Sequence, residues 1–218
     1  MSQFTVSANQ LRAAMLFTSK DKSRPTLQCV HLYRRDDGRA FLEATDSYKM
    51  IVIDITENDQ LTPKEDKEPC SILFYASDCK NALPSGRQSK TEKPLVSIKT
   101  ETKSFASLTA LQPQSLCGTC TMVHIQDYQY PSTEKCLKDA IYKDEPEQHL
   151  FNSEFVETCC KAAKQLGKDY LGTVMLATPL NKTWEVRFAL GTLAQMITMP
   201  LMHTNGEEKL ILKHCITE

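Results

Sequence analysis

SRPTLQCVHLYRRDDGRAFLEATDSYKMIVIDI, residues 23–55, is the stretch of sequence that decides the fold. Apolar and polar residues alternate from Leu27 to Arg34, as in a strand with one buried face. The Asp-Asp-Gly sequence at 36–38 is typical of a tight hairpin turn, in which some residues take positive φ. Two more strands are predicted at 41–45 and 48–55, which makes a three-stranded meander. One face of such a meander is apolar and needs another element to cover it.

The order strand, helix, three strands occurs three times, near residues 3–56, 70–126 and 149–200. In the first unit, Ser7 is expected to cap a helix that begins at Ala8. The later helices are predicted at 77–83, capped by Ser77, and from Asn152 or Ser153 to 166, and residues 57–69 are predicted to be a polar linker. The later strands are predicted at 70–74, 95–100, 104–110 and 120–126, then at 149–151, 173–177, 183–190 and 193–199.

The composition excludes several classes of protein. The 218 residues include 26 Lys and Arg against 27 Asp and Glu, a formal charge of -1, which argues against tight binding of nucleic acid by charge alone. Nine Cys at irregular spacing do not form a secreted disulfide framework. The sequence shows no signal peptide and no apolar run of about 18 residues, so we expect a cytoplasmic protein that does not enter a membrane.

Catalytic and metal-binding chemistry find little support in the sequence. Cys117 and Cys120 form a CxxC, which in other settings is a redox site or half of a zinc site. Here it precedes a strand rather than a helix, and no second CxxC or HxxxH supplies further zinc ligands. No P-loop, GxGxxG, HExxH or GxSxG is present, and Asp46 is explained as a turn-forming residue. We therefore predict no enzyme, no cofactor and no metal, with a thiol or zinc protein as the third hypothesis.

Three segments resemble the bacterial DNA polymerase III beta sliding clamp family, in the family's order. The first combines SRPTL at 23–27 with ATDSYKM at 44–50, where the family has an Arg shortly before a Leu and then an Ala-Thr-Asp-Gly-His-Arg-Leu-like segment. The second is YPSTEKCL at 130–137, similar to the family's aromatic-Pro-Asp-Tyr-Arg-Arg-Val-Leu junction. The third is ITMPL at 197–201, similar to its C-terminal Val-Val-Met-Pro-Met.

The resemblance implies an α+β fold, the DNA-clamp fold, in which repeated strand–helix–three-strand units place helices on one face of antiparallel sheets. In the family two units make a domain, three domains a subunit, and two subunits close a ring around DNA. This chain then looks like a shortened member or a clamp-like protein. It would have a domain of two repeats at 1–128 and a partial domain, one repeat plus a tail, at 129–218.

The resemblance also implies a hydrophobic cleft for short partner peptides. When the family's residues are carried over one by one, one wall of the cleft consists of Leu27, Thr45, Ser47, Tyr48, Lys49 and Met50. The floor at the domain junction consists of Pro131, Lys135 and Cys136, and the second wall of Ile197, Met199, Pro200 and Leu201. Met and Pro suit an adaptable apolar lining. The alternative is that Met50, Ile197 and Met199 are core residues. The cleft departs from the family's residues at Ser47, Tyr48 and Leu201, which argues against carrying the family's consensus for partner peptides over to this chain.

In the family, basic side chains on the ring-lining helices touch DNA phosphates without reading bases, which is sequence-independent and sensitive to salt. The corresponding candidates are Arg12, Lys20, Lys22, Arg24, Lys80, Arg87, Lys161, Lys164 and Lys168. For each of them a solvated helix face is the alternative.

The expected function is that of a processivity factor in DNA replication, which encircles double-stranded DNA and docks a polymerase or other clamp-binding protein. A clamp loader is a further possible partner. A ring of twelve units would need four copies of a three-unit chain, so the hypothesis is a homotetramer. The alternative is a clamp-fold interaction protein that binds partner peptides without encircling DNA.

Overall fold

The computed structural model describes residues 2–63, 68–83, 94–111, 120–131, 133, 152–167, 176–179, 186–190 and 194–198. The first unit contains β1 (Gln3–Ser7), α1 (Ala8–Met15), β2 (Cys29–Arg34), β3 (Ala40–Thr45) and β4 (Lys49–Asp54), followed by the short helix α2 (Thr56–Asp59). The second contains β5 (Cys70–Tyr75), α3 (Ala76–Cys79), β6 (Leu95–Thr100), β7 (Phe105–Leu111) and β8 (Cys120–His124). The third contains α5 (Ser153–Leu166), β9 (Leu176–Pro179), β10 (Val186–Leu190) and β11 (Ala194–Thr198).

The start signals of the two long helices are confirmed. The Ser7 hydroxyl accepts the N–H of Asn9 (3.1 Å), and the Gln10 side chain accepts the N–H of Ser7 (2.9 Å), which completes a capping box. The Asn152 carboxamide accepts the N–H of Glu154 (2.9 Å) and caps α5. The predicted strand at 149–151 lies outside the described residues.

Three predictions were wrong in detail. Leu27 is not in a strand: Pro25–Gln28 is a 3-10 turn, which suits the fixed φ of Pro25, and β2 begins at Cys29. Ser77 does not cap a helix: α3 begins at Ala76 and continues as a 3-10 turn over Lys80–Ala82. The supposed linker 57–69 begins with α2 and buries Asn58, Asp59 and Thr62, because a buried arginine takes Asp59 as its partner.

The first two units exchange their first strands. The four-stranded sheet has the order β1-β6-β7-β8, so β1 of the first unit completes the sheet of the second. The seven-stranded sheet has the order β5-β2-β3-β4-β11-β10-β9, so β5 of the second unit pairs antiparallel with β2 of the first. The third unit joins the same sheet through the antiparallel pair β4–β11. All strand pairs among the described residues are antiparallel, as the predicted fold class requires.

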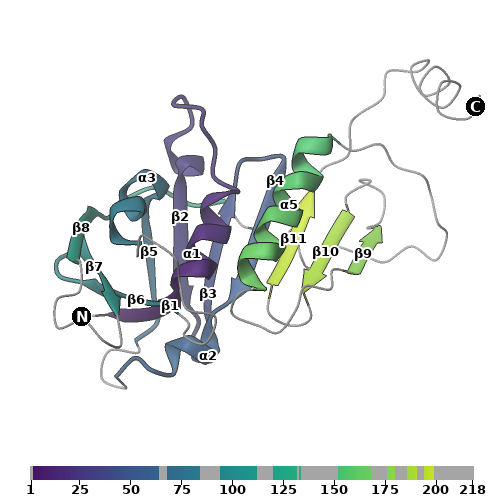
Figure 1. Ribbon diagram of the computed structural model, residues 1–218. Coiled ribbons are helices and arrows are strands. Elements are labelled where there is room, and N and C mark those ends of the chain that lie inside the picture. Colours follow the sequence, from purple (N-terminus) through teal and green to yellow (C-terminus); the bar gives the residue numbers. More distant parts are fainter. Residues whose placement is uncertain are drawn as a thin grey trace, which may run out of the picture.

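Helices α1 and α5 lie side by side on one face of the seven-stranded sheet (Figure 1). Their apolar sides pack into the main core with alternate residues of β3, β4 and β11, such as Leu42, Ile51 and Met196. The residues between these alternate positions face the other way. We call that opposite side of the sheet the outer face, and it carries a small cluster of Phe41, Met50, Val52 and Ile197 with Tyr33 against it.

A buried ion pair fixes the corner between the two sheets. Arg34 and Asp59 have side chains 0% and 2% exposed, and Nη2 of Arg34 lies 2.8 Å from Oδ2 of Asp59. Arg34 also donates to the carbonyl of Gln3 (2.7 Å), and Asp59 accepts the N–H of Thr5 (3.2 Å). The pair therefore connects β2 and α2 to the exchanged strand β1.

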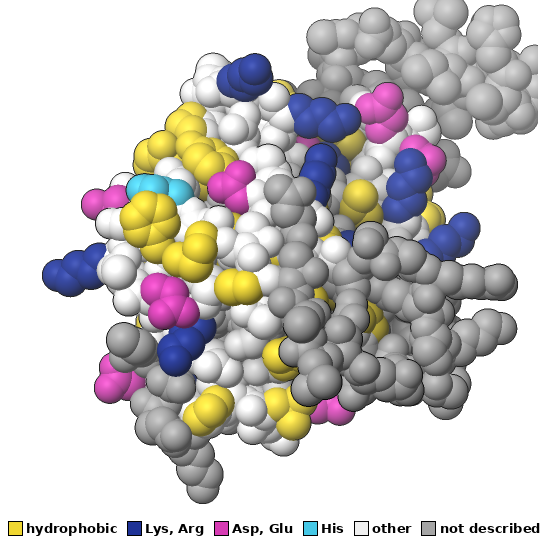
Figure 2. Space-filling view, turned by 60° about the vertical axis from the view of Figure 1, so that its left-hand side comes forward, with side chains coloured by type: hydrophobic (Ala, Val, Ile, Leu, Met, Phe, Trp, Pro, Cys, Tyr) yellow, Lys and Arg dark blue, Asp and Glu magenta, His cyan; other side chains and the backbone are white. Residues whose placement is uncertain are grey.

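Hydrophobic side chains are exposed on the four-stranded sheet. Phe105, Leu111 and Met122 are the large ones, from β7 and β8. Figure 2 is turned toward this end of the molecule and shows hydrophobic side chains gathered near a histidine. Among the described residues, no helix is long and apolar enough to cross a membrane.

We predict that Asp59→Ala lowers the free energy of unfolding by about 3–5 kcal/mol, because it leaves the Arg34 guanidinium buried without its counter-ion. Urea denaturation followed by circular dichroism measures the change. The matched control is Asp37→Ala, which breaks the exposed pair between Asp37 and Arg39 (2.7 Å) and should cost a small fraction of that energy. Equal losses in the two variants would contradict a special role for the buried pair.

Candidate functional site

The predicted site residues at 45–50 form a tight turn between β3 and β4. The Asp46 carboxylate accepts the N–H groups of Tyr48 (3.0 Å) and Lys49 (2.9 Å), as expected of a turn-forming Asp. The Thr45 hydroxyl accepts the N–H of Ser47 (3.2 Å) and donates to the carbonyl of Lys49 (2.9 Å). Ser47 has a φ of 82°, in the left-handed region that favours glycine. The position where the resembling family has Gly therefore needs a glycine-like backbone here too.

The β4–β11 pair brings two predicted wall residues together. Met50 and Ile197 are register partners, and both belong to the cluster on the outer face. Thr45 is the register partner of Met50 in β3 and lies on the same face. Met50 and Ile197 are 7% and 3% exposed, so neighbouring groups already cover most of their surface. Leu27 is also buried, and its carbonyl accepts the N–H of Ser19 (2.7 Å).

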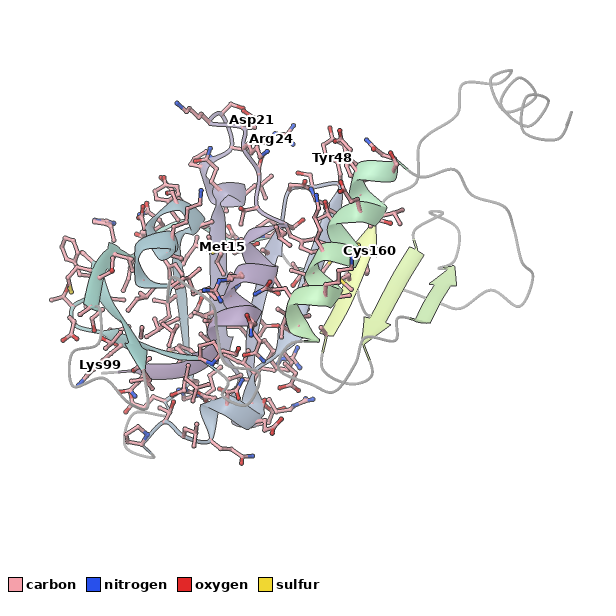
Figure 3. All side chains as sticks on the ribbon, viewed as in Figure 1. Met15, Asp21, Arg24, Tyr48, Lys99 and Cys160 are labelled. Carbon is pink, nitrogen blue, oxygen red and sulfur yellow. The ribbon has the colours of Figure 1, made fainter. Side chains whose placement is uncertain are left out.

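Two other predicted residues point to the helix side. The ring of Tyr48 stacks on that of Phe155 in α5, with centroids 6.0 Å apart and planes at 23°. Nζ of Lys49 lies 5.4 Å from the centroid of the same Phe155 ring and pairs with the Asp46 carboxylate. Tyr48 remains 56% exposed. Figure 3 places it at one end of α5, on the same end of the molecule as Asp21 and Arg24.

A buried polar group on the outer face was missed by sequence reasoning. The Glu43 carboxylate lies 2.6 Å from Nδ1 of His31 and accepts the hydroxyl of Thr133. Nε2 of His31 lies 2.7 Å from the hydroxyl of Ser71, and the Tyr130 ring lies against the imidazole with centroids 4.7 Å apart. A glutamate inside the otherwise apolar β3 sequence AFLEAT was the available signal. These contacts hold part of the 130–137 junction segment against the sheet.

Burial raises the pKa of the Tyr130 phenol well above its ordinary value, and the negative charge of Glu43 adds to this shift. The phenol therefore stays neutral at physiological pH. Its hydroxyl is buried without a hydrogen-bond partner among the described residues.

The remaining predicted wall and floor residues are mostly not described. Pro131 is exposed at the start of the junction segment. Lys135, Cys136, Met199, Pro200 and Leu201 lie outside the described residues. The complete lining of a peptide cleft therefore stays a prediction.

The described basic candidates lie at three places: on the helices α1 and α5, in the loop after α1 and beside α3. Lys161 and Lys164 lie on the solvent side of α5, and half-buried Arg12 lies on α1, where its Nη1 donates to the Asn9 side chain (3.3 Å). Lys161 also pairs with Glu157 (2.8 Å) on the exposed surface. Exposed Lys20, Lys22 and Arg24 lie in the loop after α1, exposed Lys80 lies beside α3, and Arg87 and Lys168 are outside the described residues.

The buried cysteines among the described residues include Cys29 and Cys159. Burial raises the pKa of the Cys29 and Cys159 thiols to about 12, so both stay protonated at physiological pH. Cys120 is exposed on β8, and Cys117 lies outside the described residues. In the described part of the chain, no three His, Cys, Asp or Glu side chains are grouped so as to hold a metal ion.

We predict that Ser47→Gly stabilises the protein by roughly 0.5–1 kcal/mol. The left-handed backbone costs an L-residue about 1–2 kcal/mol, and the greater freedom of unfolded glycine returns part of that gain. The reciprocal control is Gly38→Ala in the β2–β3 hairpin, also at a φ of 82° and with open space around it, which should destabilise. Thermal unfolding of both variants measures the signs. Destabilisation by Ser47→Gly would show that the hydrogen bond from Arg24 to the Ser47 hydroxyl (3.2 Å) outweighs the strain.

No protein-family model and no curated protein sequence matches this chain. Solved structures do match. The chain is similar to the DNA polymerase III beta subunit of Thermotoga maritima with a TM-score of 0.63 at 9% identity, over 96% of this chain and 67% of that one. It is similar to the DNA polymerase sliding clamp of Bacillus subtilis with a TM-score of 0.64 at 10% identity, over 93% of this chain and 64% of that one.

A third match is the beta subunit of DNA polymerase from Streptococcus pyogenes, with a TM-score of 0.59 at 13% identity, over 99% of this chain and 68% of that one. The chain thus spans about two thirds of the length of these structures. At such low identity the likeness concerns the fold. The predicted fold is confirmed: this chain has the fold of the DNA polymerase III beta-subunit sliding clamps.

Proposed function

We propose that this protein is a non-enzymatic, sliding-clamp-like processivity factor for DNA replication. The observation that supports this most is the placement of α1 and α5 side by side on one face of a sheet shared by two units (Figure 1). A series of such units presents helices to one side and strands to the other. This is the arrangement that a clamp needs to surround a duplex.

The helix face would meet DNA through phosphate contacts alone. Lys161 and Lys164 are exposed on α5, and the side chains of Asn9 and Gln165 join α1 to α5 by a hydrogen bond of 2.5 Å. Glu157 partly neutralises Lys161, so attraction at this face is weak. Weak attraction suits a ring, because topological linkage retains the DNA while the protein slides.

The other face would receive partner peptides near the β4–β11 junction. Met50 and Ile197 lie there with Thr45 beside Met50, and because both are almost fully covered, a peptide would have to displace neighbouring groups to reach them. The docked protein would be a polymerase or another clamp-binding protein. Twelve units would require four copies of this chain, so the proposed assembly is a homotetramer, which a clamp loader could open.

The second candidate function is a clamp-fold interaction protein that binds peptides without encircling DNA. The formal charge of -1 and the pairing of Lys161 with Glu157 favour it, because both reduce attraction for phosphate. The two functions differ in whether the DNA is retained by a protein ring closed around it. That difference can be measured directly.

The test compares linear DNA with free ends and the same DNA with both ends blocked by a bulky protein. A ring threaded onto DNA slides off free ends, so we expect longer retention on blocked DNA that persists at high salt. Simple electrostatic binding would be equal on the two DNAs and lost at high salt. That result would contradict encirclement and favour the peptide-binding alternative.

We predict that the double variant Lys161→Glu, Lys164→Glu shortens retention on blocked DNA several-fold, because it places negative charge on the helix face. The control is Lys99→Glu on β6, which changes the formal charge half as much and lies far from α5 (Figure 3). The control should be retained like the wild type. Equal loss in both variants would show that overall charge matters rather than the helix face.

A further inference from the structure

The strand β8 has a free edge among the described residues. It ends the four-stranded sheet, and no described strand pairs with its other side. The edges nearest the corner between the sheets are covered instead. On β1, the N–H of Thr5 donates to the Asp59 carboxylate (3.2 Å), and on β5 the carbonyl of Leu73 accepts the N–H of Gln126 (2.7 Å).

The backbone direction of β8 follows from two hydrogen bonds just after it. The N–H of Ile125 donates to the carbonyl of Ser104 (2.8 Å), on the β7 side. The N–H of Gln126 points the other way and donates to Leu73. Because this direction alternates along a strand, the N–H groups of Cys120, Met122 and His124 point away from β7. The free edge thus offers a row of backbone donors and acceptors, of which the His124 carbonyl already accepts the Gln126 side chain (3.1 Å), a contact that a second strand would displace.

The edge also lacks the features that normally protect one. Its sequence, CTMVH, contains no Lys, Glu, Asp or Pro. Met122 is 55% exposed, and its neighbour Phe105 in β7 is 43% exposed. The Phe105 ring meets His124 edge-on, with centroids 5.1 Å apart. Because this edge is apolar, uncharged and open, another strand can pair with it.

The topology of the chain indicates which strand would pair with the free edge of β8. Each unit ends with a last strand, and the last strands of the first and third units, β4 and β11, pair with one another antiparallel. The last strand of the second unit is β8, and it has no such partner in the described part of the chain. We propose that β8 pairs antiparallel with β8 of a second copy of this chain, about a two-fold axis at Met122.

This pairing is self-complementary. On the axis, Met122 faces the partner's Met122, and Cys120 faces the partner's His124, with each outward N–H meeting a carbonyl. No like charges oppose one another, because the strand carries none. Phe105 and Met122 of both copies then form one apolar strip. The dimer would place six units in a row, which is half of the twelve-unit ring. Only the relation to the ring rests on the proposed function; the pairing of the two β8 strands does not.

The first test is the solution mass by light scattering across a range of concentrations. Met122→Pro removes an outward N–H without touching the ladder to β7, so it should halve the mass of the wild-type assembly. Met122→Thr removes the same side chain but keeps the N–H, and it should retain the wild-type mass at high concentration. Circular dichroism checks that both variants are folded. A wild-type monomer at every concentration, or equal masses for all three proteins, would overturn the proposal.

The second test is cross-linking in a Cys120→Ser background. Facing residues of a hydrogen-bonded pair have Cα atoms about 5.5 Å apart, within the range that a disulfide spans. Met122→Cys should therefore give a disulfide-linked dimer on mild oxidation. The control Leu111→Cys, exposed on β7, would lie roughly 30 Å from its copy, three strand spacings across and eight residues along the strands, and should not cross-link. Equal cross-linking of both would contradict this register.

These tests can fail separately from the test of the proposed function. A dimer through β8 that shows no end-dependent retention on DNA would contradict encirclement and leave the pairing intact. Retention on blocked DNA by a protein whose mass Met122→Pro does not change would contradict the pairing and leave encirclement intact.

Discussion

The structure depends on the exchange of first strands between the first two units. Since β1 completes the four-stranded sheet and β5 extends the seven-stranded one, neither unit can satisfy its backbone hydrogen bonds alone. The exchange also brings polar backbone groups into a buried corner. The Arg34–Asp59 pair satisfies several of them at once, including the Gln3 carbonyl and the Thr5 N–H. The two sheets can therefore share one core because the buried Arg34–Asp59 pair satisfies the polar groups at the corner between them.

The third unit attaches by the same physical means, through a strand edge and a helix face. β11 pairs with β4, and α5 packs beside α1. As a result, the two surfaces of the seven-stranded sheet carry different side chains. The helix side exposes Lys161 and Lys164, while the outer face carries the apolar cluster and the buried Glu43. The proposed contacts to DNA and to partner peptides are thus separated by the thickness of the sheet.

Local patterns were sufficient to predict most elements, because alternation and caps act over a few residues. The Ser7 cap, a cap at Asn152 or Ser153 and the meander of β2, β3 and β4 were predicted for that reason. The buried roles of Asp59 and Glu43 were not, because their partners lie far away in the sequence. For the site, the resemblance placed Met50 and Ile197 in opposite walls of a cleft, whereas the register makes them neighbours in one sheet; the cleft, with Lys135 and Met199, stays a prediction. The stacking of Tyr48 on Phe155 had no local signal.

The charge of the chain bears on how such a protein could act on DNA. With a formal charge of -1 and Lys161 already paired with Glu157, the helix face supplies little net attraction at physiological salt. Lasting association would then have to come from closure around the duplex. In the proposed ring, closure would depend on strand edges, because units in this chain join through such an edge in the β4–β11 pair. On this argument, the uncharged edge of β8 would contribute more to function than any single basic residue.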